Sequence, residues 1–369
     1  YGADVIMRAN YALEHGTEAL SMCVRKAVNE MLGSLAEDAG IRREDVFQVC
    51  VVGNTCMHHL FLGISPVSLV HAPYTPAVSE RLVLNAGDYG LAVQERAELI
   101  MLSDIAGYVG ADTCGCLLAI RQDQQEEISL MIDIGTNGEM VLGNRERMVT
   151  CSTAAGPAFE GAKIECGMRG AAGAVDHVKY EEGKWNYTTV GNKPAVGLCG
   201  SGLIDLVAGL LDAGMLDENG VLRSGQEKQG VFILVPPERG GNERGVYLTQ
   251  KDLGEVQLAK AAIAAGIQML MERLGITEDD ICSVYIAGAF GNYMDPVSAG
   301  KIGLLPATLV KKVKPVGNAA GEGAKIALVN EKEMLEMDEL VRKIEFVELA
   351  ASADFQDHFI DELGFETGE

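Results

Sequence analysis

Residues 129–153, SLMIDIGTNGEMVLGNRERMVTCST, decide the fold of this chain. Three apolar segments in it, SLMIDIG, EMVLGN and RMVTCST, are separated by short runs of turn-forming and charged residues. Apolar segments of this length, bounded by turn residues, are typical of strands joined by hairpins. The stretch therefore predicts a three-stranded meander whose first turn has the sequence Asp133-Ile-Gly-Thr-Asn-Gly-Glu139.

That first turn has the composition of a phosphate-binding loop with a metal ligand. Gly135 and Gly138 permit backbone N–H groups to face an anion. Thr136 and Asn137 add side-chain donors, and Asp133 at the strand end can hold Mg²⁺ through a water molecule. A plain hairpin with an Asn-Gly turn explains Asn137 and Gly138 equally well, so both interpretations stay open on this motif alone.

A second motif, AGPAFEGAKI, follows the meander and predicts the start of a helix. Gly156 would lie at its start and Glu160 at the helix N-terminus. A carboxylate there is stabilised by the helix dipole whether or not it does chemistry. Glu160 is therefore expected to be either a capping group or a catalytic group.

Two later glycine clusters stand where strands end and helices begin. In Gly197-Leu-Cys-Gly200-Ser201-Gly202, Ser201 is the expected N-cap, and the amides of Gly200 and Ser201 could bind an anion. In Ala287-Gly288-Ala-Phe-Gly291-Asn292 the glycines would let a flat base lie against the backbone. Glycine is frequent in this chain, so neither cluster is specific by itself.

Strands and helices alternate along most of the chain, which predicts an α/β fold. Residues 171–250 form a Gly-rich insertion of short strands and one helix, and Thr249 with Asp252 is a capping box for a long helix. The remaining expected elements are a helix from the N-terminus to Gly40, strands at 98–104 and 283–290, and small-residue helices at 104–120 and 318–328.

Composition excludes several classes of protein. With 48% apolar and 22% charged residues the chain can build a large core, so disorder is excluded. A net charge of −23 argues against nucleic acid as a partner. The nine cysteines are scattered without zinc-finger or cluster spacing, which predicts reduced cytoplasmic thiols. No apolar run approaches the length of a membrane span, so no membrane association is expected.

The order of these motifs resembles the second half of the ASKHA superfamily, which contains acetate and sugar kinases, chaperone ATPases and actin. The resemblance implies a bilobal, actin-like (ribonuclease H-like) fold with mixed sheets flanked by helices. Residues 1–127 would be a first lobe, incomplete at its N-terminus, 128–317 the second lobe, and 318–369 a connecting helix and tail. The helices at 104–120 and 318–328 would cross at a hinge, which gives a reason for their glycines: Gly107, Gly110, Gly321 and Gly323.

Within that superfamily the chain resembles the reductive activators of corrinoid proteins. The shared segments include VVGNTCMHHLFLG, DIGTNGEMVLGN, CSTAAGPAFEGAKI, GLCGSGLID and YIAGAFGNYMD. The resemblance implies binding and hydrolysis of Mg²⁺-ATP, coupled to reduction of Co(II) corrinoid in a methyltransferase partner to Co(I). It also places Gln257 and Lys260 near the adenosine, although a solvated lysine is the plain alternative. Activators of this kind are often homodimers.

The same resemblance predicts that an iron–sulfur domain, which delivers the electron, and a first phosphate hairpin precede Tyr1 in a longer protein. Three alternatives remain: a small-molecule kinase, an activator of 2-hydroxyacyl-CoA dehydratases, and a nucleotide-sensing scaffold without turnover. His58 and His59 could contact a partner's corrinoid or simply pack and cap a helix.

Overall fold

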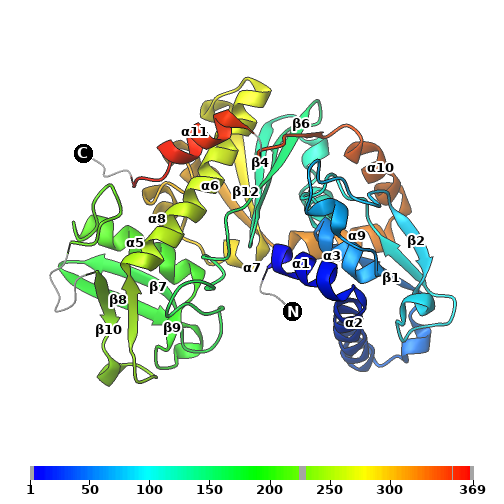
Figure 1. Ribbon diagram of the computed structural model, residues 1–369, viewed down its shortest axis with the longest axis horizontal. Coiled ribbons are helices and arrows are strands. Elements are labelled where there is room, and N and C mark those ends of the chain that lie inside the picture. Colours follow the sequence, from blue (N-terminus) through cyan, green and yellow to red (C-terminus); the bar gives the residue numbers. More distant parts are fainter. Residues whose placement is uncertain (1–3, 224–229, 351, 366–369) are drawn as a thin grey trace. The chain divides into compact units, whose positions relative to one another are not determined.

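The computed structural model describes residues 4–223, 230–350 and 352–365. It divides into two compact units (Figure 1). Unit 1 runs to Glu126 and adds Asn144–Thr150 and Asn318–Phe346, whereas unit 2 comprises Glu127–Gly143, Cys151–Gly317 and the residues from Val347. Each unit combines helices with a sheet of mixed strand direction, so the predicted α/β class is confirmed.

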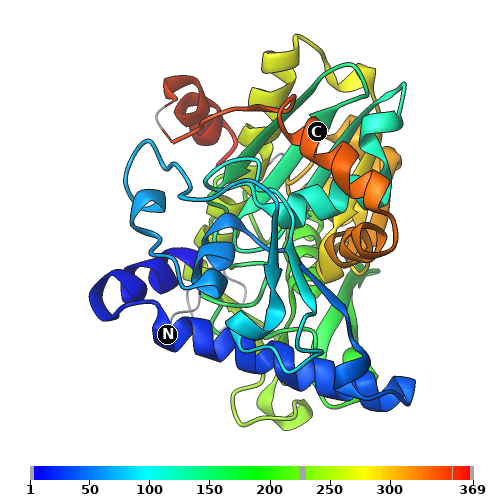
Figure 2. The same ribbon diagram turned by 90° about the vertical axis from the view of Figure 1, so that its right-hand side faces the viewer.

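Unit 1 begins with two helices, α1 (Val5–His15) and α2 (Glu18–Ala39), where the sequence predicted one (Figure 2). Gly16 separates them: its φ of 82° is a conformation that glycine adopts without strain, and its N–H caps α1 by donating to Ala12 O. The predicted end of the second helix at Gly40 is confirmed, since Gly40 is left-handed and donates to the last carbonyls of α2.

The sheet of unit 1 has the order β1-β3-β2, with β1 (Gln48–Val51) parallel to β3 (Glu98–Met101) and β2 (Leu82–Asn85) antiparallel to it. Helix α3 (Thr55–Leu62) follows β1 and is capped by Asn54, whose side chain accepts from Met57 N. Leu60 and Phe61 of α3 are buried in two different clusters, Leu60 against α1 and Phe61 against the sheet, so α3 contributes to both.

Helices α4 (Ala111–Ile120) and α9 (Ala319–Val329) pack closely in unit 1. The prediction of a helix from residue 104 is wrong, because Gly110 is the N-cap of α4 and Gly107 lies in the preceding turn. The expectation that glycines allow close helix approach is confirmed at Gly323. A Cβ there would lie 1.9 Å from the carbonyl oxygen of Gly115. The C-terminal part of unit 1 is α10 (Glu331–Val341) and β14 (Glu345–Phe346).

The central sheet of unit 2 contains the predicted meander, which is confirmed. Its strands are β4 (Ile128–Ile134), β5 (Gly138–Gly143) and β6 (Met148–Thr153). On the other side of β4 lie the parallel strands β12 (Ile281–Ala287) and β13 (Val313–Gly317), so the order within unit 2 is β13-β12-β4-β5. In unit 1, Val149 and Thr150 of β6 pair with β14. Parallel pairing brings the carboxyl ends of β4 and β12 to one edge of the sheet.

A long helix, α6 (Gln250–Leu274), packs on β5, and α11 (Ala353–Asp361) packs against α6 (Figure 1). The predicted capping box is confirmed: Asp252 N donates to Thr249 Oγ1, and Thr249 N donates to Asp252 Oδ2. The rest of unit 2 comprises β7 (Ala174–Glu181), β8 (Lys184–Thr189), β9 (Gly197–Leu198), α5 (Gly200–Asp212), β10 (Val231–Val235), β11 (Val246–Thr249), α7 (Gly288–Gly291) and α8 (Pro296–Lys301).

Candidate functional site

Asp133 and Gly288 meet at the carboxyl edge of the unit 2 sheet. Asp133 pairs in register with Ala287 of β12, and Gly288 follows directly. Gly288 has φ +85°, and a Cβ on it would lie 3.1 Å from Asp133 Oδ1, so glycine leaves room beside the carboxylate. Burial raises the pKa of Asp133. Among the described residues nothing donates a hydrogen bond to this carboxylate, which leaves its oxygens available for an added cation.

The turn after Asp133 is closed by hydrogen bonds of its own. Gly135 N donates to Asn137 O at 2.9 Å, so the predicted orientation of the Gly135 N–H toward an anion is wrong in this conformation. Gly138 lies in β5, where a Cβ would be 2.8 Å from Thr153 Oγ1. Gly138 is thus required for space, while Thr136 and Asn137 remain half-buried at the tip of the turn.

Glu160 reaches the same turn. Thr136 Oγ1 donates to Glu160 Oε1 at 2.7 Å. The predicted helix at residues 155–164 is wrong: the segment forms consecutive turns, with Gly156 at φ +77°. Because no helix begins at this segment, a helix dipole does not explain the carboxylate of Glu160. The carboxylate is held instead by the predicted phosphate turn.

Two aromatic residues that the sequence did not single out hold the loops of the site together. The rings of Phe159 and Phe290 stack at 5.9 Å between centroids. Gly200, the first residue of α5, lies against both, since a Cβ on it would be 2.1 Å from Phe159 O and 2.7 Å from Phe290 Cε2. The only sequence signal for this pair was their position inside glycine-rich loops.

The N-terminus of α5 differs from prediction at Ser201. The N-cap is Cys199, and Ser201 lies inside the first turn, buried, with its Oγ 3.4 Å from Cys199 Sγ. The N-cap was assigned to the serine by residue type, whereas β9 ends at Leu198 and α5 begins at Gly200, which puts the N-cap two residues before Ser201.

The remaining predicted adenosine residues have the following surroundings. Gly291 packs on Ile286 in α7, and Asn292 lines a cavity of about 630 Å³ in unit 2. Gln257 Nε2 donates to Leu363 O at 2.9 Å. Lys260 is buried, its Nζ donates to Gly364 O, and it lies 5.7 Å from the centre of the Phe365 ring. The plain alternative of a solvated Lys260 is therefore wrong.

His58 and His59 belong to unit 1 and are buried. His59 Nε2 accepts from Ala77 N at 2.9 Å and Nδ1 donates to Thr55 O at 2.7 Å; burial lowers its pKa. Both ring nitrogens thus serve internal bonds of a neutral imidazole. His58 Nδ1 lies 3.2 Å from Asp104. These contacts agree with the alternative that His59 packs inside the protein.

The site of unit 2 fits a magnesium–phosphate ligand. Asp133 and Glu160 supply two carboxylates and Thr136 a hydroxyl around one turn. Mg²⁺ is usually held by one or two carboxylates, water and substrate phosphates rather than by a complete protein cage. The described ranges contain no group of three or more His, Cys, Asp or Glu side chains that could hold a metal ion.

Comparisons with known proteins show the family of this chain. Residues 127–369 match the family model of the C-terminal domain of RACo, the ASKHA domain, and residues 1–125 match the RACo middle region. The chain belongs to the RACo family. The ASKHA fold predicted from the order of the motifs is thereby confirmed. In the described part of the chain, no helix is long and apolar enough to cross a membrane.

Three similar proteins indicate what members of this family do. The corrinoid activation enzyme RamQ of Eubacterium limosum is 35% identical over 98% of this chain. The [Co(II) methylated amine-specific corrinoid protein] reductase of Methanosarcina barkeri is 27% identical over 99%. A solved reductive activator for corrinoid, iron–sulfur protein superposes with a TM-score of 0.90 over 99% of the chain at 37% identity. The chain spans 63%, 71% and 60% of their respective lengths.

Proposed function

We propose that this chain is the nucleotide-binding ATPase part of a protein that returns the Co(II) corrinoid of a methyltransferase partner to Co(I). The single observation that carries the proposal is the meeting of Asp133, the Thr136–Glu160 pair and Gly288 at one sheet edge. The named relatives, which activate or reduce corrinoid proteins, support the choice of reaction.

In this proposal the side chains of the turn bind the phosphates and position a metal. Thr136 and Asn137 would donate to phosphate oxygens beside Gly138, and Asp133 would hold a water of the magnesium ion. The metal supplies neutralisation of the phosphate charge. Glu160 would orient the attacking water. The hydroxyl of Thr136 has one proton, which it now donates to Glu160, so its donation to a phosphate oxygen would free that carboxylate for water when phosphate is bound.

The nucleoside would lie along the glycines of the second strand end and the start of α5. Gly288, Gly291 and Asn292 continue from β12, and Gly200 and Ser201 begin α5. The Phe159–Phe290 stack fixes these loops relative to each other within unit 2. Contacts to Gln257 and Lys260, which now bind the segment Leu363–Phe365, would require that segment to be displaced.

Nucleotide energy has a physical use in such a reaction. A Co(II) centre that keeps an axial ligand is hard to reduce, and removal of the ligand raises its reduction potential. ATP binding or hydrolysis would favour the state of the complex in which the ligand is released. The proposed partners are thus a corrinoid protein and a reductant acting through an iron–sulfur domain, in a cytoplasmic, homodimeric protein.

The test uses the full-length protein with its corrinoid partner, Mg²⁺-ATP and a low-potential reductant. Formation of Co(I) is followed by its absorbance under anaerobic conditions. We expect ATP-dependent Co(I) formation that Asp133→Ala abolishes and that Asp279→Ala, at an exposed position of the same unit, leaves intact. Normal Co(I) formation by Asp133→Ala would contradict the proposal and favour a scaffold that binds without turnover.

A further inference from the structure

A groove follows α2 in unit 1 and is lined only by residues of that unit. One cavity of about 540 Å³ lies between α2, the end of α3 and the 3₁₀ helix Ala86–Tyr89. A second of about 410 Å³ continues toward Arg43. Both are lined by Met22, Arg25 and Tyr89, so they form one elongated hollow, the α2 groove.

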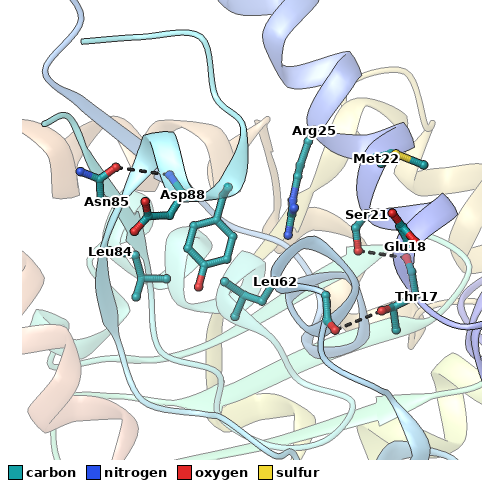
Figure 3. A pocket seen from close by; sticks show the side chains of 11 residues that line it. Thr17, Glu18, Ser21, Met22, Arg25, Leu62, Leu84, Asn85 and Asp88 are labelled. Atoms are coloured by element: carbon teal, nitrogen blue, oxygen red, sulfur yellow. Dashed lines mark hydrogen bonds between the residues drawn. The ribbon is translucent and has the colours of Figure 1, made fainter. Parts of the chain in front are cut away.

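Arg25 stands where the two cavities meet. Its Nε and Nη2 donate to Phe61 O at 2.8 and 2.6 Å, and its guanidinium lies 5.8 Å from the ring centre of Phe61 and 5.2 Å from that of Tyr89. Figure 3 shows the side chain reaching from α2 toward Leu62. No carboxylate of the described residues forms an ion pair with it, and its Nη1 has no acceptor there. The guanidinium of Arg25 is thus held in one orientation and has no carboxylate partner among the described residues.

Arg43 is a second such cation in the same groove. Its guanidinium lies against α2 at Gly33, where a Cβ would be 2.0 Å from Arg43 Nη2. Within the described part of the chain it has no carboxylate partner either, whereas the adjacent Arg42 pairs with Asp45 at 2.8 Å. The chain has 53 acidic against 30 basic residues. Glu18, Glu30 and Asp88 also line the hollow, but none of them forms an ion pair with Arg25 or Arg43, and Glu30 lies 3.9 Å from Lys26 instead. Two half-buried arginines without an ion-pair partner among the described residues therefore indicate an anionic ligand.

The other lining groups indicate what else the ligand carries. Met22 is 58% exposed between the two cavities and offers an apolar contact. The hydroxyls of Thr17 and Ser21 already donate to backbone carbonyls. Glu18 and Asp88 also line the first cavity, and Figure 3 shows them on opposite sides of Arg25. A ligand must therefore direct its acidic group at the two arginines and offer apolar and amide groups to the rest of the hollow.

We propose that the α2 groove binds an acidic, amphipathic peptide segment of a partner protein. A carboxylate of that segment lies on the guanidinium groups of Arg25 and Arg43, and an apolar side chain covers Met22. The backbone amides continue toward Glu18 and Asp88. A compact inorganic anion would satisfy the arginines but would leave Met22, Glu18 and Asp88 without a contact.

The experiment measures fluorescence anisotropy of a labelled synthetic peptide of alternating Glu and Leu residues, titrated with the whole chain. The same peptide with Gln in place of Glu is the matched probe, and inorganic phosphate is the competitor. We expect saturable binding of the Glu peptide, weakened about tenfold or more by Arg25→Gln and by Arg43→Gln, as for a lost charge-assisted hydrogen bond. Arg96→Gln, exposed and outside the groove, should bind as the unaltered chain does.

Three results would overturn the inference. These are equal binding of the Glu and Gln peptides, unchanged affinity in both arginine variants, and displacement of the peptide by phosphate at equal concentration, which would indicate a small-anion site. Circular dichroism checks the fold of each variant. Arg25 also contacts Phe61, so Arg25→Gln could unfold the chain, and Arg43→Gln then gives an independent answer. Arg25→Lys keeps the positive charge but removes the two-pronged guanidinium, so it shows which of the two the peptide requires.

Discussion

Replacing Gly323 with alanine should force α4 and α9 apart. In the structure a Cβ at position 323 would lie 1.9 Å from the carbonyl oxygen of Gly115 and 2.5 Å from its Cα. Ordinary contact begins at 3.4 Å, so the two backbones must separate by about 1.5 Å locally. The obstacle is backbone, which cannot rotate away as a flexible side chain does. The strain must therefore be relieved by moving a helix.

The expected loss follows from two opposing effects. Alanine is better than glycine in a helix by about 1 kcal/mol. Overpacking of a close contact costs about 1–3 kcal/mol, occasionally more, and the backbone obstacle points to the upper end. We expect the free energy of unfolding to fall by about 2 kcal/mol, measured by urea unfolding followed by far-ultraviolet circular dichroism. Hydrogen exchange should rise in residues 111–120 and 319–329.

Gly254→Ala is the matched control. Gly254 lies inside helix α6 and a Cβ there would meet nothing within 4 Å. The same substitution should therefore raise the free energy of unfolding by up to about 1 kcal/mol. If Gly323→Ala stabilised the chain as Gly254→Ala does, the close approach of α4 and α9 would be refuted.

Three further predictions concern single groups. Because burial raises the pKa of Asp133 above its ordinary 3.8, the folded chain binds a proton more readily than the unfolded chain, and stability falls as pH rises between the two values. Asp133→Asn should therefore have a higher melting temperature than the unaltered chain at neutral pH, with the difference shrinking toward acid pH; a lower melting temperature at neutral pH would contradict this. Thr136→Val should cost about 0.5–1.5 kcal/mol of unfolding free energy by removing the bond to Glu160, while Thr136→Ser should cost less, by urea unfolding. Iodoacetamide should alkylate Cys23 and Cys282, the exposed thiols, before the buried and half-buried cysteines, and peptide mass spectrometry would show any other order.

Local sequence signals predicted much of the fold. The meander follows from apolar segments between turns, and the start of α6 follows from Thr249 and Asp252, because hairpins and capping boxes are set by neighbouring residues. The break at Gly16 was missed, since the apolar spacing continues across it and a single glycine is tolerated in many helices.

Contacts between distant segments limited prediction of the site. AGPAFEGAKI has a composition that is compatible with a helix start. In the structure, however, Glu160 accepts a hydrogen bond from Thr136, and the ring of Phe159 stacks on that of Phe290. Both partners are far away in sequence. The composition of two local motifs supplied Asp133 and Gly288 as site residues, and the register pairing of Asp133 with Ala287, which brings Gly288 beside it, became visible only in the structure. Their roles toward ATP stay a prediction.

Titration calorimetry of Mg²⁺-ATP tests the central claim most directly, with the unaltered chain compared with Gly288→Val. A valine at φ +85° is strained, and its Cβ would stand 3.1 Å from Asp133 Oδ1, in the space proposed for the nucleotide. The account predicts saturable binding by the unaltered chain and its loss in the variant, with circular dichroism spectra that match. No binding by the unaltered chain, or equal binding by both, would contradict a nucleotide site at the ends of β4 and β12.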